Sequence, residues 1–300
     1  MEEIAIKGHL ITHKDCLDGA TAALVGWASG LDPLFVEPDR ALTALEQLAA
    51  KDDVLPIYLA DVSIPKESYS HWAPALGWIL DHHATALPLA AENRVTIDLG
   101  RSGSHLFYDY AVHQGWLAPS KAWDRLVAMV EAYDLWMPRH DPGQNLERLF
   151  RARGLSWYHQ RFGQGWVPLV ASEAEDLARL VREEQALLQK SLARIRHLTA
   201  GRWEIAGLLM DEDGSTNELS HRLLQQGYSL VLIAKPDGRL SARSDQQIDA
   251  SEMMAKLFRG GGHRRAAGGR RPADVPFDES GLNRLLGQIK ESLEPDSSPS

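Results

Sequence analysis

The stretch from residue 77 to residue 83, GWILDHH, constrains the fold more than any other part of the chain. Its first four residues have the apolar and aromatic character of a buried strand, and the strand ends at Asp81, His82 and His83. Three ionisable side chains in succession are unfavourable inside an apolar core. They suit the edge of an open α/β sheet, where ligands usually bind. The stretch therefore predicts a strand whose carboxyl end forms part of a binding site.

Two earlier segments repeat this pattern. Residues 4–13 have a strand pattern that ends at His13, and residues 56–60 have a strand pattern that Asp61 follows. Helices are predicted between and after these strands, at about residues 18–29, 39–51 and 66–72. Such alternation with short connections predicts an α/β fold with a mostly parallel sheet and helices on both faces. Because parallel strands end along one edge, the ionisable side chains at the three strand ends are expected to converge.

The turn after the first predicted strand is rich in metal-binding side chains. Residues 13–19, HKDCLDG, place an imidazole, two carboxylates and a thiol close together in the chain. These are hard and borderline metal ligands, and Gly19 allows a close approach of the backbone. The alternative is a solvated turn in which Asp18 caps the following helix.

Two later segments are candidates for the same edge. Asp134 follows a predicted helix at residues 122–131, and residues 100–105, GRSGSH, form a small-residue turn that opens another helix. The backbone amides of such a turn can bind a phosphate, with Ser104 and His105 as candidate substrate-binding residues. An ordinary helix-end loop and a simple N-cap are the alternatives.

The second half of the chain predicts a smaller α/β domain. A helix without proline or glycine is expected from about residue 172 to 198, and strands are expected at residues 203–210, 228–234 and 240–243. A glycine- and arginine-rich loop, RGGGHRRAAGGRR, follows at residues 259–271 and could present backbone amides and cations to an anion. A solvated basic loop is the alternative. The predicted organisation is a metal-binding catalytic domain, a connector helix, a substrate-binding domain and a disordered tail, at residues 1–171, 172–199, 200–292 and 293–300.

Composition narrows the function classes. A formal net charge of −9 over 300 residues argues against a basic surface that coats nucleic acid, and leaves room for a short anionic substrate in a local basic cluster. The single cysteine, Cys16, excludes an internal disulfide and a multi-cysteine zinc finger. No secretory signal and no apolar run near membrane-spanning length is visible, so we expect a cytoplasmic protein without membrane contact.

The chemistry of the predicted edge points to metal ions. A set of carboxylates and imidazoles without a thiol cluster suits Mn²⁺, with Mg²⁺, Fe²⁺, Co²⁺ and Zn²⁺ as alternatives. The number of candidate ligands exceeds the need of one ion, so two ions bridged by a carboxylate such as Asp61, about 3.5–4 Å apart, are expected. Such a pair generates hydroxide at neutral pH and neutralises charge on a phosphoryl group. Phosphate-ester hydrolysis is the reaction class that follows.

Together these motifs resemble the DHH superfamily of phosphoesterases, whose signature is the Asp81-His82-His83 triplet. The resemblance includes residues 13–19, Asp61 and Asp134, and it extends to Arg243-Ser244 and residues 260–268, which look like the DHH-associated C-terminal domain. It covers about residues 4–285, nearly the whole chain.

The resemblance implies two Mn²⁺ ions in the N-terminal domain and a C-terminal domain that closes over the substrate. One ion would be bound by His13, Asp15 and Asp61, and the other by Asp18, Asp61, His82 and Asp134. His83 would face the scissile phosphate, and Asp81 would orient a ligand histidine. By the resemblance, Arg243, His263 and Arg264 would hold the terminal nucleotide or phosphate. Gly261 and Gly262 of the glycine-rich loop are further candidate substrate-binding residues.

The first motif departs from the family's common Asp-x-Asp-Gly spacing. Asp15 and Asp18 are separated by two residues, so alignment on Asp18-Gly19 places Cys16 at the first aspartate position. We expect Asp15 to reach the metal, with Cys16 as the alternative ligand. A thiolate would favour a softer ion such as Zn²⁺ or Fe²⁺.

The sequence leaves three functions open. The leading prediction is a phosphodiesterase or exonuclease that hydrolyses short single-stranded oligonucleotides or dinucleotides to mononucleotides. The second keeps the metal site but acts on polyphosphate, pyrophosphate or a nucleotide monoester. The third is an inactive, nucleotide-binding regulatory module. The oligomeric state stays open, with a homodimer as the general expectation for soluble oligomers.

Overall fold

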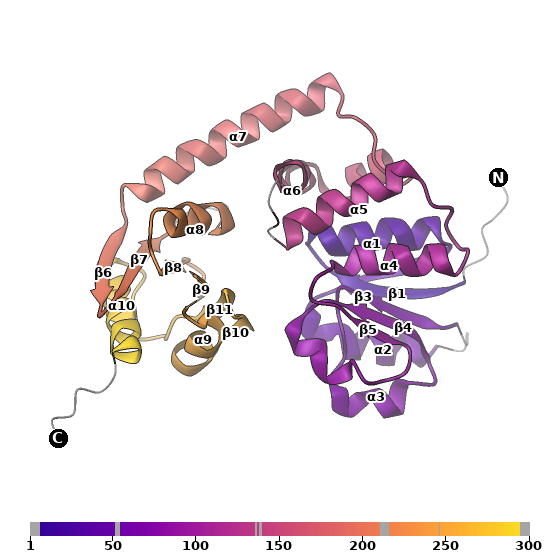
Figure 1. Ribbon diagram of the computed structural model, residues 1–300, viewed down its shortest axis with the longest axis horizontal. Coiled ribbons are helices and arrows are strands. Elements are labelled where there is room, and N and C mark those ends of the chain that lie inside the picture. The colour runs from indigo at the N-terminus through magenta and orange to yellow at the C-terminus, as the bar shows by residue number, and fades with distance from the viewer. Residues whose placement is uncertain are drawn as a thin grey trace. The chain divides into compact units, whose positions relative to one another are not determined.

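The computed structural model describes residues 7–51, 55–135, 137, 140–210, 216–245 and 247–294, without the side chains of Asn217 and His263. The chain divides into two compact units, Met1–Leu177 and Ala178–Ser300 (Figure 1). The boundary falls inside helix α7 (Ala171–Leu192), the predicted connector. The predicted strand residues 4–6 and most of the predicted tail, residues 295–300, lie outside the described part of the chain.

The first unit is built on a five-stranded sheet with the order β2-β1-β3-β4-β5. All four neighbouring pairs are parallel, which confirms the predicted parallel sheet. The strands are β1 (Gly8–His13), β2 (Leu31–Val36), β3 (Ile57–Ala60), β4 (Leu76–Asp81) and β5 (Val95–Ile97).

Helices cover both faces of this sheet (Figure 1). Successive strand residues alternate between two cores: Ala60 and Leu80 belong to one, and Leu59 and Ile79 to the other. This alternation follows from the pleat of a strand that is buried on both sides. The first core contains residues of α1 (Leu17–Ala28), α4 (Gly103–His113), α5 (Lys121–Asp134) and α6 (Asp141–Phe162). The second contains residues of α2 (Ala41–Ala49) and α3 (Lys66–Trp72).

The strand register aligns the ionisable residues at the carboxyl edge. Thr12 pairs with Ala60, and Ala60 pairs with Leu80. The next residue along each strand is therefore His13, Asp61 or Asp81. Because the three strands are parallel and adjacent, these residues lie in one row at the end of the sheet. This is the convergence that the sequence predicts.

The second unit contains a six-stranded mixed sheet with the order β10-β11-β9-β8-β7-β6. β7 and β8 pair in parallel, and the other neighbours are antiparallel. One core includes residues of α9 (Ala250–Phe258) and α10 (Glu279–Leu293), and another includes α8 (Thr216–Gln225) and Leu188 of α7. The strands are β6 (Arg196–Ala200), β7 (Trp203–Leu209), β8 (Leu230–Ala234), β9 (Arg239–Ser244), β10 (Gly261–His263) and β11 (Ala266–Arg270).

Two predicted elements differ from the structure in this unit. The connector helix ends at Leu192, because the chain then turns into strand β6. The expected glycine-rich loop is a hairpin, with β10 and β11 joined through Arg264 and Arg265. A Cβ on Gly260 would lie 1.9 Å from the carbonyl oxygen of Gly268, so the glycine permits this close strand approach. Within the described residues, no helix has the length and hydropathy needed to cross a membrane.

Candidate metal centre

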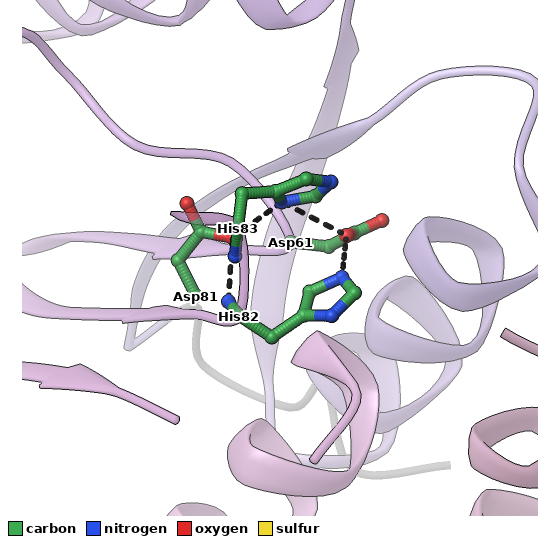
Figure 2. A group of neighbouring side chains, drawn as sticks. All are labelled: Asp61, Asp81, His82 and His83. Carbon is green, nitrogen blue, oxygen red and sulfur yellow. Dashed lines mark hydrogen bonds and ion pairs between the residues drawn. The ribbon is translucent and has the colours of Figure 1, made fainter. Parts of the chain in front are cut away.

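Asp61 lies at the centre of the row of ionisable residues. Its side chain is 2% exposed, and its backbone has a positive φ of 62°, which is unusual for a residue other than glycine. Its Oδ1 atom lies 3.1 Å from His82 Nε2 (Figure 2). Its Oδ2 atom accepts a hydrogen bond from Cys16 Sγ at 3.2 Å and lies 3.6 Å from His13 Nδ1. The two oxygens of one carboxylate therefore face two different sets of ligands.

The first set comprises His13, Cys16 and Asp61. One potential ligand atom from each residue lies within 4.8 Å of those of the other two. His13 ends strand β1, Cys16 precedes helix α1, and Asp61 follows strand β3. An imidazole, a thiol and a carboxylate so arranged are chemically able to bind one divalent ion.

The second set comprises Asp18, His82 and Asp134, which also lie within 4.8 Å of one another. His82 Nε2 is 3.5 Å from Asp134 Oδ2 and 4.0 Å from Asp18 Oδ2. Both of these carboxylate oxygens are buried and make no hydrogen bond within the described part of the chain. Buried carboxylate oxygens without a donor are costly unless a cation neutralises them. The set therefore fits a second divalent ion, with Asp61 Oδ1 beside it.

Asp81 and His83 form a third contact at the same edge. His83 Nδ1 lies 2.8 Å from Asp81 Oδ1, which also accepts hydrogen bonds from the amides of His82 and His83 (Figure 2). The sequence predicts that Asp81 orients a histidine that binds metal. In the structure, the imidazole ring that Asp81 contacts is that of His83, which is predicted to face the substrate. Asp81 thus fixes both the backbone turn after β4 and the orientation of the His83 ring.

The turn before α1 differs from both sequence expectations. Cys16 is the N-cap of the helix, because its Sγ accepts a hydrogen bond from Gly19 N at 3.2 Å. Asp18 is not the cap: it lies in the first helical turn, is 1% exposed, and accepts a hydrogen bond from Ser104 N. The Asp15 side chain is 79% exposed and lies 3.6 Å from Lys14 Nζ. The positive φ of Asp15, 55°, turns the chain at this point, so Cys16 occupies the place expected for Asp15.

Ser104 and His105, predicted to bind substrate, are engaged with protein groups. Ser104 is fully buried and its amide donates to Asp18 Oδ1 at 3.1 Å. His105 Nδ1 lies 2.9 Å from Glu131 Oε2. Ser104 therefore supports Asp18 of the candidate ligand set, and His105 contacts Glu131 of α5.

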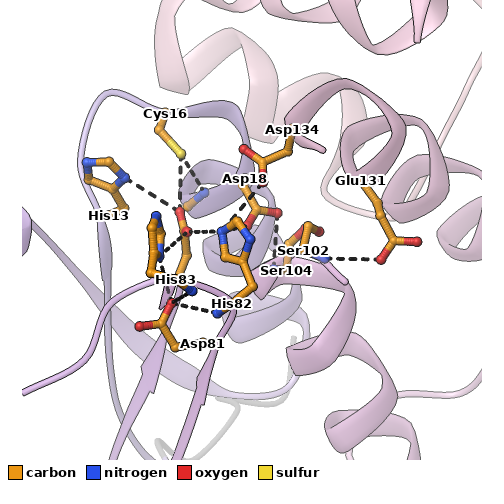
Figure 3. A network of polar contacts seen from close by, with 12 residues as sticks. His13, Cys16, Asp18, Asp81, His82, His83, Ser102, Ser104, Glu131 and Asp134 are labelled. Atoms are coloured by element: carbon orange, nitrogen blue, oxygen red, sulfur yellow. Dashed lines mark hydrogen bonds and ion pairs between the residues drawn. The ribbon is translucent and has the colours of Figure 1, made fainter. Parts of the chain in front are cut away.

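Glu131 is a residue that the sequence analysis missed. Its Oε2 atom also accepts a hydrogen bond from Ser102 N at 3.1 Å (Figure 3). Arg101 Nε donates another to the same atom at 2.9 Å. Glu131 lies one helical turn before Asp134 in α5. That spacing was the available signal, because residues three apart share a helix face.

The pKa values of the buried side chains in the site are shifted, because several negative charges lie close together. Burial, together with the charge of Asp61, raises the pKa of Asp18 to about 6. Burial and the charge of Asp18 raise the pKa of Asp134 to about 8. Burial opposes the charging of His82, but the hydrogen bond with Asp61 and the charges of Asp134 and Asp18 raise its pKa to about 10. Burial acts to raise the pKa of Asp61, yet its contacts with His13 and His82 hold that pKa well below the ordinary value.

The predicted substrate-binding residues of the second unit lie on its β9–β11 segment. Arg243 in β9 is partly buried and donates from Nη1 to Ser241 Oγ and to the Ala242 carbonyl. Gly261 and Gly262 are exposed in β10, and Arg264 is exposed at the hairpin turn. The backbone of His263 pairs with Ala266, whereas its side chain lies outside the described part of the structure. Substrate binding by this group stays a prediction.

Comparisons with known proteins agree with this architecture. Residues 209–294 match the DHHA1 domain family. The chain is 25% identical over 298 residues to oligoribonuclease NrnB of Bacillus subtilis (strain 168), covering 87% of this chain and 72% of that protein. A crystal structure of exonuclease RecJ bound to manganese matches with a TM-score of 0.57 and 18% identity, covering 96% of this chain and 90% of that one. An exopolyphosphatase-related protein from Bacteroides fragilis matches with a TM-score of 0.53 and 15% identity, covering 96% and 94%.

The fold and the edge cluster define a two-unit α/β protein with acidic and imidazole side chains at the carboxyl end of a parallel sheet. Residues 209–294 match the DHHA1 domain family, and the comparisons support a DHH superfamily phosphoesterase. The resemblance read from the sequence motifs is thereby confirmed. The relatives compared include nucleases that act on phosphate esters.

Proposed function

We propose that this protein is a two-metal-dependent phosphodiesterase that hydrolyses short oligonucleotides or dinucleotides to mononucleotides. The observation that carries the proposal is the position of Asp61, whose two oxygens face the His13–Cys16 set and the His82 set. A carboxylate in this position can bridge two ions. When bound, such ions supply a nucleophile from water at neutral pH and neutralise charge on the phosphoryl group.

The protein's own groups would position the reaction. Asp18 and Asp134 are placed by α1 and by the end of α5, and the Ser104 amide fixes one oxygen of Asp18. His82 is 8% exposed and is held in place by Asp61. These rigid supports restrict the ligand atoms to one arrangement before any substrate arrives, which favours catalysis by preorganisation.

His83 is the residue that we assign to the substrate. It is partly exposed, whereas Asp81 behind it is 1% exposed. Burial acts to lower the pKa of His83, but the hydrogen bond with Asp81 and its charge outweigh burial and raise that pKa. The ring is therefore oriented and able to hold a proton, which suits the protonation of a leaving oxygen.

A nucleotide substrate is supported by the similarity to an oligoribonuclease over most of the chain. Arg264, one of two exposed arginines in the β10–β11 turn, is of the residue type that binds phosphate in bidentate fashion. Polyphosphate and nucleotide monoesters carry the same kind of group, so substrate choice needs a direct measurement.

The test is hydrolysis of a matched substrate panel by the metal-loaded protein. The panel contains short 5′- and 3′-labelled oligonucleotides, linear and cyclic dinucleotides, polyphosphate and a nucleotide monoester, each with Mn²⁺, Mg²⁺ and Zn²⁺ separately. We expect mononucleotide release, and its loss in Asp61→Asn. Asp32→Asn is the matched control, because Asp32 is 57% exposed in the edge strand β2.

Other outcomes would contradict the proposal. Phosphate release from polyphosphate without mononucleotide release would indicate a polyphosphatase with the same metal centre. Nucleotide binding without cleavage of any phosphoester would indicate a regulatory module. Unchanged hydrolysis by Asp61→Asn would exclude the two-metal arrangement described above.

A further inference from the structure

The turn that precedes α1 brings a thiol into a site otherwise made of carboxylates and imidazoles. We propose that Cys16 Sγ is a metal ligand in the His13–Asp61 set and that it gives this position a preference for Zn²⁺, Co²⁺ or Fe²⁺ over Mn²⁺ and Mg²⁺. This inference rests on the metal-dependent function proposed above and names the residue that determines which ion the site retains.

The first argument is the spacing of the three candidate ligand atoms. Cys16 Sγ lies 3.2 Å from Asp61 Oδ2, and His13 Nδ1 lies 3.6 Å from the same oxygen. Tetrahedral zinc with bonds of about 2.0–2.3 Å places neighbouring ligand atoms about 3.3–3.7 Å apart. The two distances therefore need only small adjustment to surround one ion.

The second argument is that the other candidate for this position points elsewhere. The Asp15 side chain is 79% exposed and lies beside Lys14 Nζ, and it belongs to none of the potential ligand groups of the described residues. Cys16 is fixed in place by the Gly19 amide, which donates to its sulfur. A carboxylate from Asp15 would reach the set only if the turn at Asp15 changed its conformation.

A separate observation, at Asp18, also favours a bound cation in this region. Asp18 is 99% buried, since its exposed fraction is 1%, and its Oδ2 atom makes no hydrogen bond within the described residues. This oxygen lies 4.0 Å from His82 Nε2, which also lies close to Asp61 and Asp134. The thiol is thus one member of a cluster that contains a buried carboxylate oxygen without a hydrogen-bond donor.

The proton balance of binding is simple. In the metal-free site, Sγ–H donates to Asp61 Oδ2, and burial, with the charges of Asp61, Asp18 and Asp134, raises the pKa of the thiol. Coordination of a divalent ion deprotonates a cysteine. The sulfur–hydrogen bond breaks, a sulfur–metal bond forms, and one proton passes to solvent. No oxidant or reductant is needed.

Ligand chemistry sets the expected preference. Thiolates favour Zn²⁺ and other borderline ions, whereas carboxylates suit Mg²⁺ and Mn²⁺. In Cys16→Asp, the candidate ligand atoms of this set would all be oxygen or nitrogen. We therefore expect Cys16→Asp to lower the ratio of Zn²⁺ to Mn²⁺ affinity by at least about tenfold, equivalent to about 1.4 kcal/mol.

The test uses the full-length, chelator-treated protein and Co²⁺ as the probe. The wild type should develop a near-ultraviolet sulfur-to-cobalt charge-transfer band on titration. Cys16→Ser and Cys16→Asp should bind Co²⁺ without that band. Asp15→Asn is the matched control and should keep the band and the wild-type affinity. Circular dichroism checks that each variant is folded, and competition titrations with Zn²⁺ and Mn²⁺ give the affinity ratio.

Each outcome decides the proposal. A band that persists in Cys16→Ser, or Co²⁺ binding by the wild type without a band, would overturn the assignment of Cys16 and leave the two-metal function standing. An affinity ratio unchanged in Cys16→Asp would overturn the stated preference. Failure of the wild type to bind any of the three ions would overturn this inference and the proposed function together.

Discussion

A single residue of the candidate metal centre can destabilise the metal-free fold and at the same time favour metal binding. Asp18 is buried beside Asp61 and Asp134, and burial with the neighbouring charge raises its pKa to about 6. Ionised Asp18 therefore destabilises the metal-free fold above that pH. The same negative charge is what a cation requires, so stability and metal binding should respond to Asp18 in opposite directions.

We expect Asp18→Asn to stabilise the metal-free protein at pH 8 by about 1–3 kcal/mol, because it removes a buried charge. The Asn oxygen can still accept the hydrogen bond of the Ser104 amide. Divalent-ion affinity should fall in the same variant. Urea unfolding with chelator and calorimetric metal titration measure the two effects. A variant less stable than wild type at pH 8, measured beside the surface control Asp32→Asn, would contradict the expectation.

The stability of the metal-free protein should also fall as the pH rises from about 6.5 to 9.5. The His82 pKa is raised to about 10, so its contribution is complete below its unfolded value of 6.5 and is lost on approach to pH 10. Asp134, with a pKa raised to about 8, keeps a proton that the unfolded chain has lost, so it acts in the same direction up to pH 8. Thermal unfolding with chelator at several pH values tests this, with His82→Gln expected to flatten the slope. A midpoint that rises with pH would show that the sign is wrong.

The kinds of side chain in the candidate metal centre could be predicted from the sequence. Which residue of the first turn, Asp15 or Cys16, faces the site could not. His13, Asp61 and His82 follow from apolar strands that end in ionisable residues, because parallel strands share an edge. The choice between Asp15 and Cys16 depends on the positive φ of Asp15, which turns its side chain towards solvent. Aspartate adopts this conformation more readily than most residues, but sequence spacing does not reveal when it does.

At the level of secondary structure elements, Glu131 connects α5 to the turn that opens α4. Its Oε2 atom is shared by Arg101 Nε, the Ser102 amide and His105 Nδ1, all within 3.1 Å. The same segment also contains Ser104, whose backbone amide donates a hydrogen bond to Asp18 Oδ1. Loss of the Glu131 charge should therefore loosen the ligands that these two helices carry.

We expect Glu131→Gln to destabilise the protein by about 1.5–3 kcal/mol, the cost of weakening hydrogen bonds to a charged and largely buried acceptor. Metal affinity should fall as well, by about tenfold. Asp109→Asn is the matched control, because Asp109 also pairs with Arg101 but is 52% exposed. Urea unfolding and metal titration compare the two variants. Equal effects from both would show that Glu131 has no special role.

Close packing of α4 against strand β3 gives a second prediction at this level. A Cβ on Gly103 would lie 2.7 Å from the Cα, Cβ and N atoms of Asp61. Gly103→Ala should displace Asp61, destabilise the fold by about 1–3 kcal/mol and weaken metal binding. Gly287→Ala in α10 is the control, because its added Cβ would have no atom within 4 Å. Wild-type metal affinity in Gly103→Ala would contradict this role.

The elements that the sequence analysis missed have weak local signals. Strand β2 contains Pro33, which a strand tolerates at the edge of a sheet, and β5 has three residues. Helix α6 contains Gly154, whose φ of 78° interrupts the helical pattern. The β10–β11 hairpin is rich in glycine, which lacks strand propensity but allows the close approach at Gly260. In each case tertiary packing decides what local propensity leaves open.

At the scale of the whole molecule, the candidate metal-ligand groups found among the described residues all belong to the first unit. They lie between His13 and Asp134, whereas the second unit has its own cores around β7, β8 and β9. An ion that binds only the folded first unit stabilises that unit by mass action, by about 2.7 kcal/mol at a hundredfold excess over the dissociation constant. The second unit gains this stability only if its opening is coupled to that of the first.

We expect metal binding to slow amide hydrogen exchange in β1, β3 and β4 and to leave β8 and β9 unchanged. The experiment compares chelator-treated and Zn²⁺- or Mn²⁺-loaded full-length protein by mass spectrometry. Asp61→Asn should lose the protection in the first unit, because it weakens the shared carboxylate of both ligand sets. Equal protection of β8 and β9 would show that the two units open together, and unchanged exchange in β1, β3 and β4 would contradict metal binding at the edge of the parallel sheet.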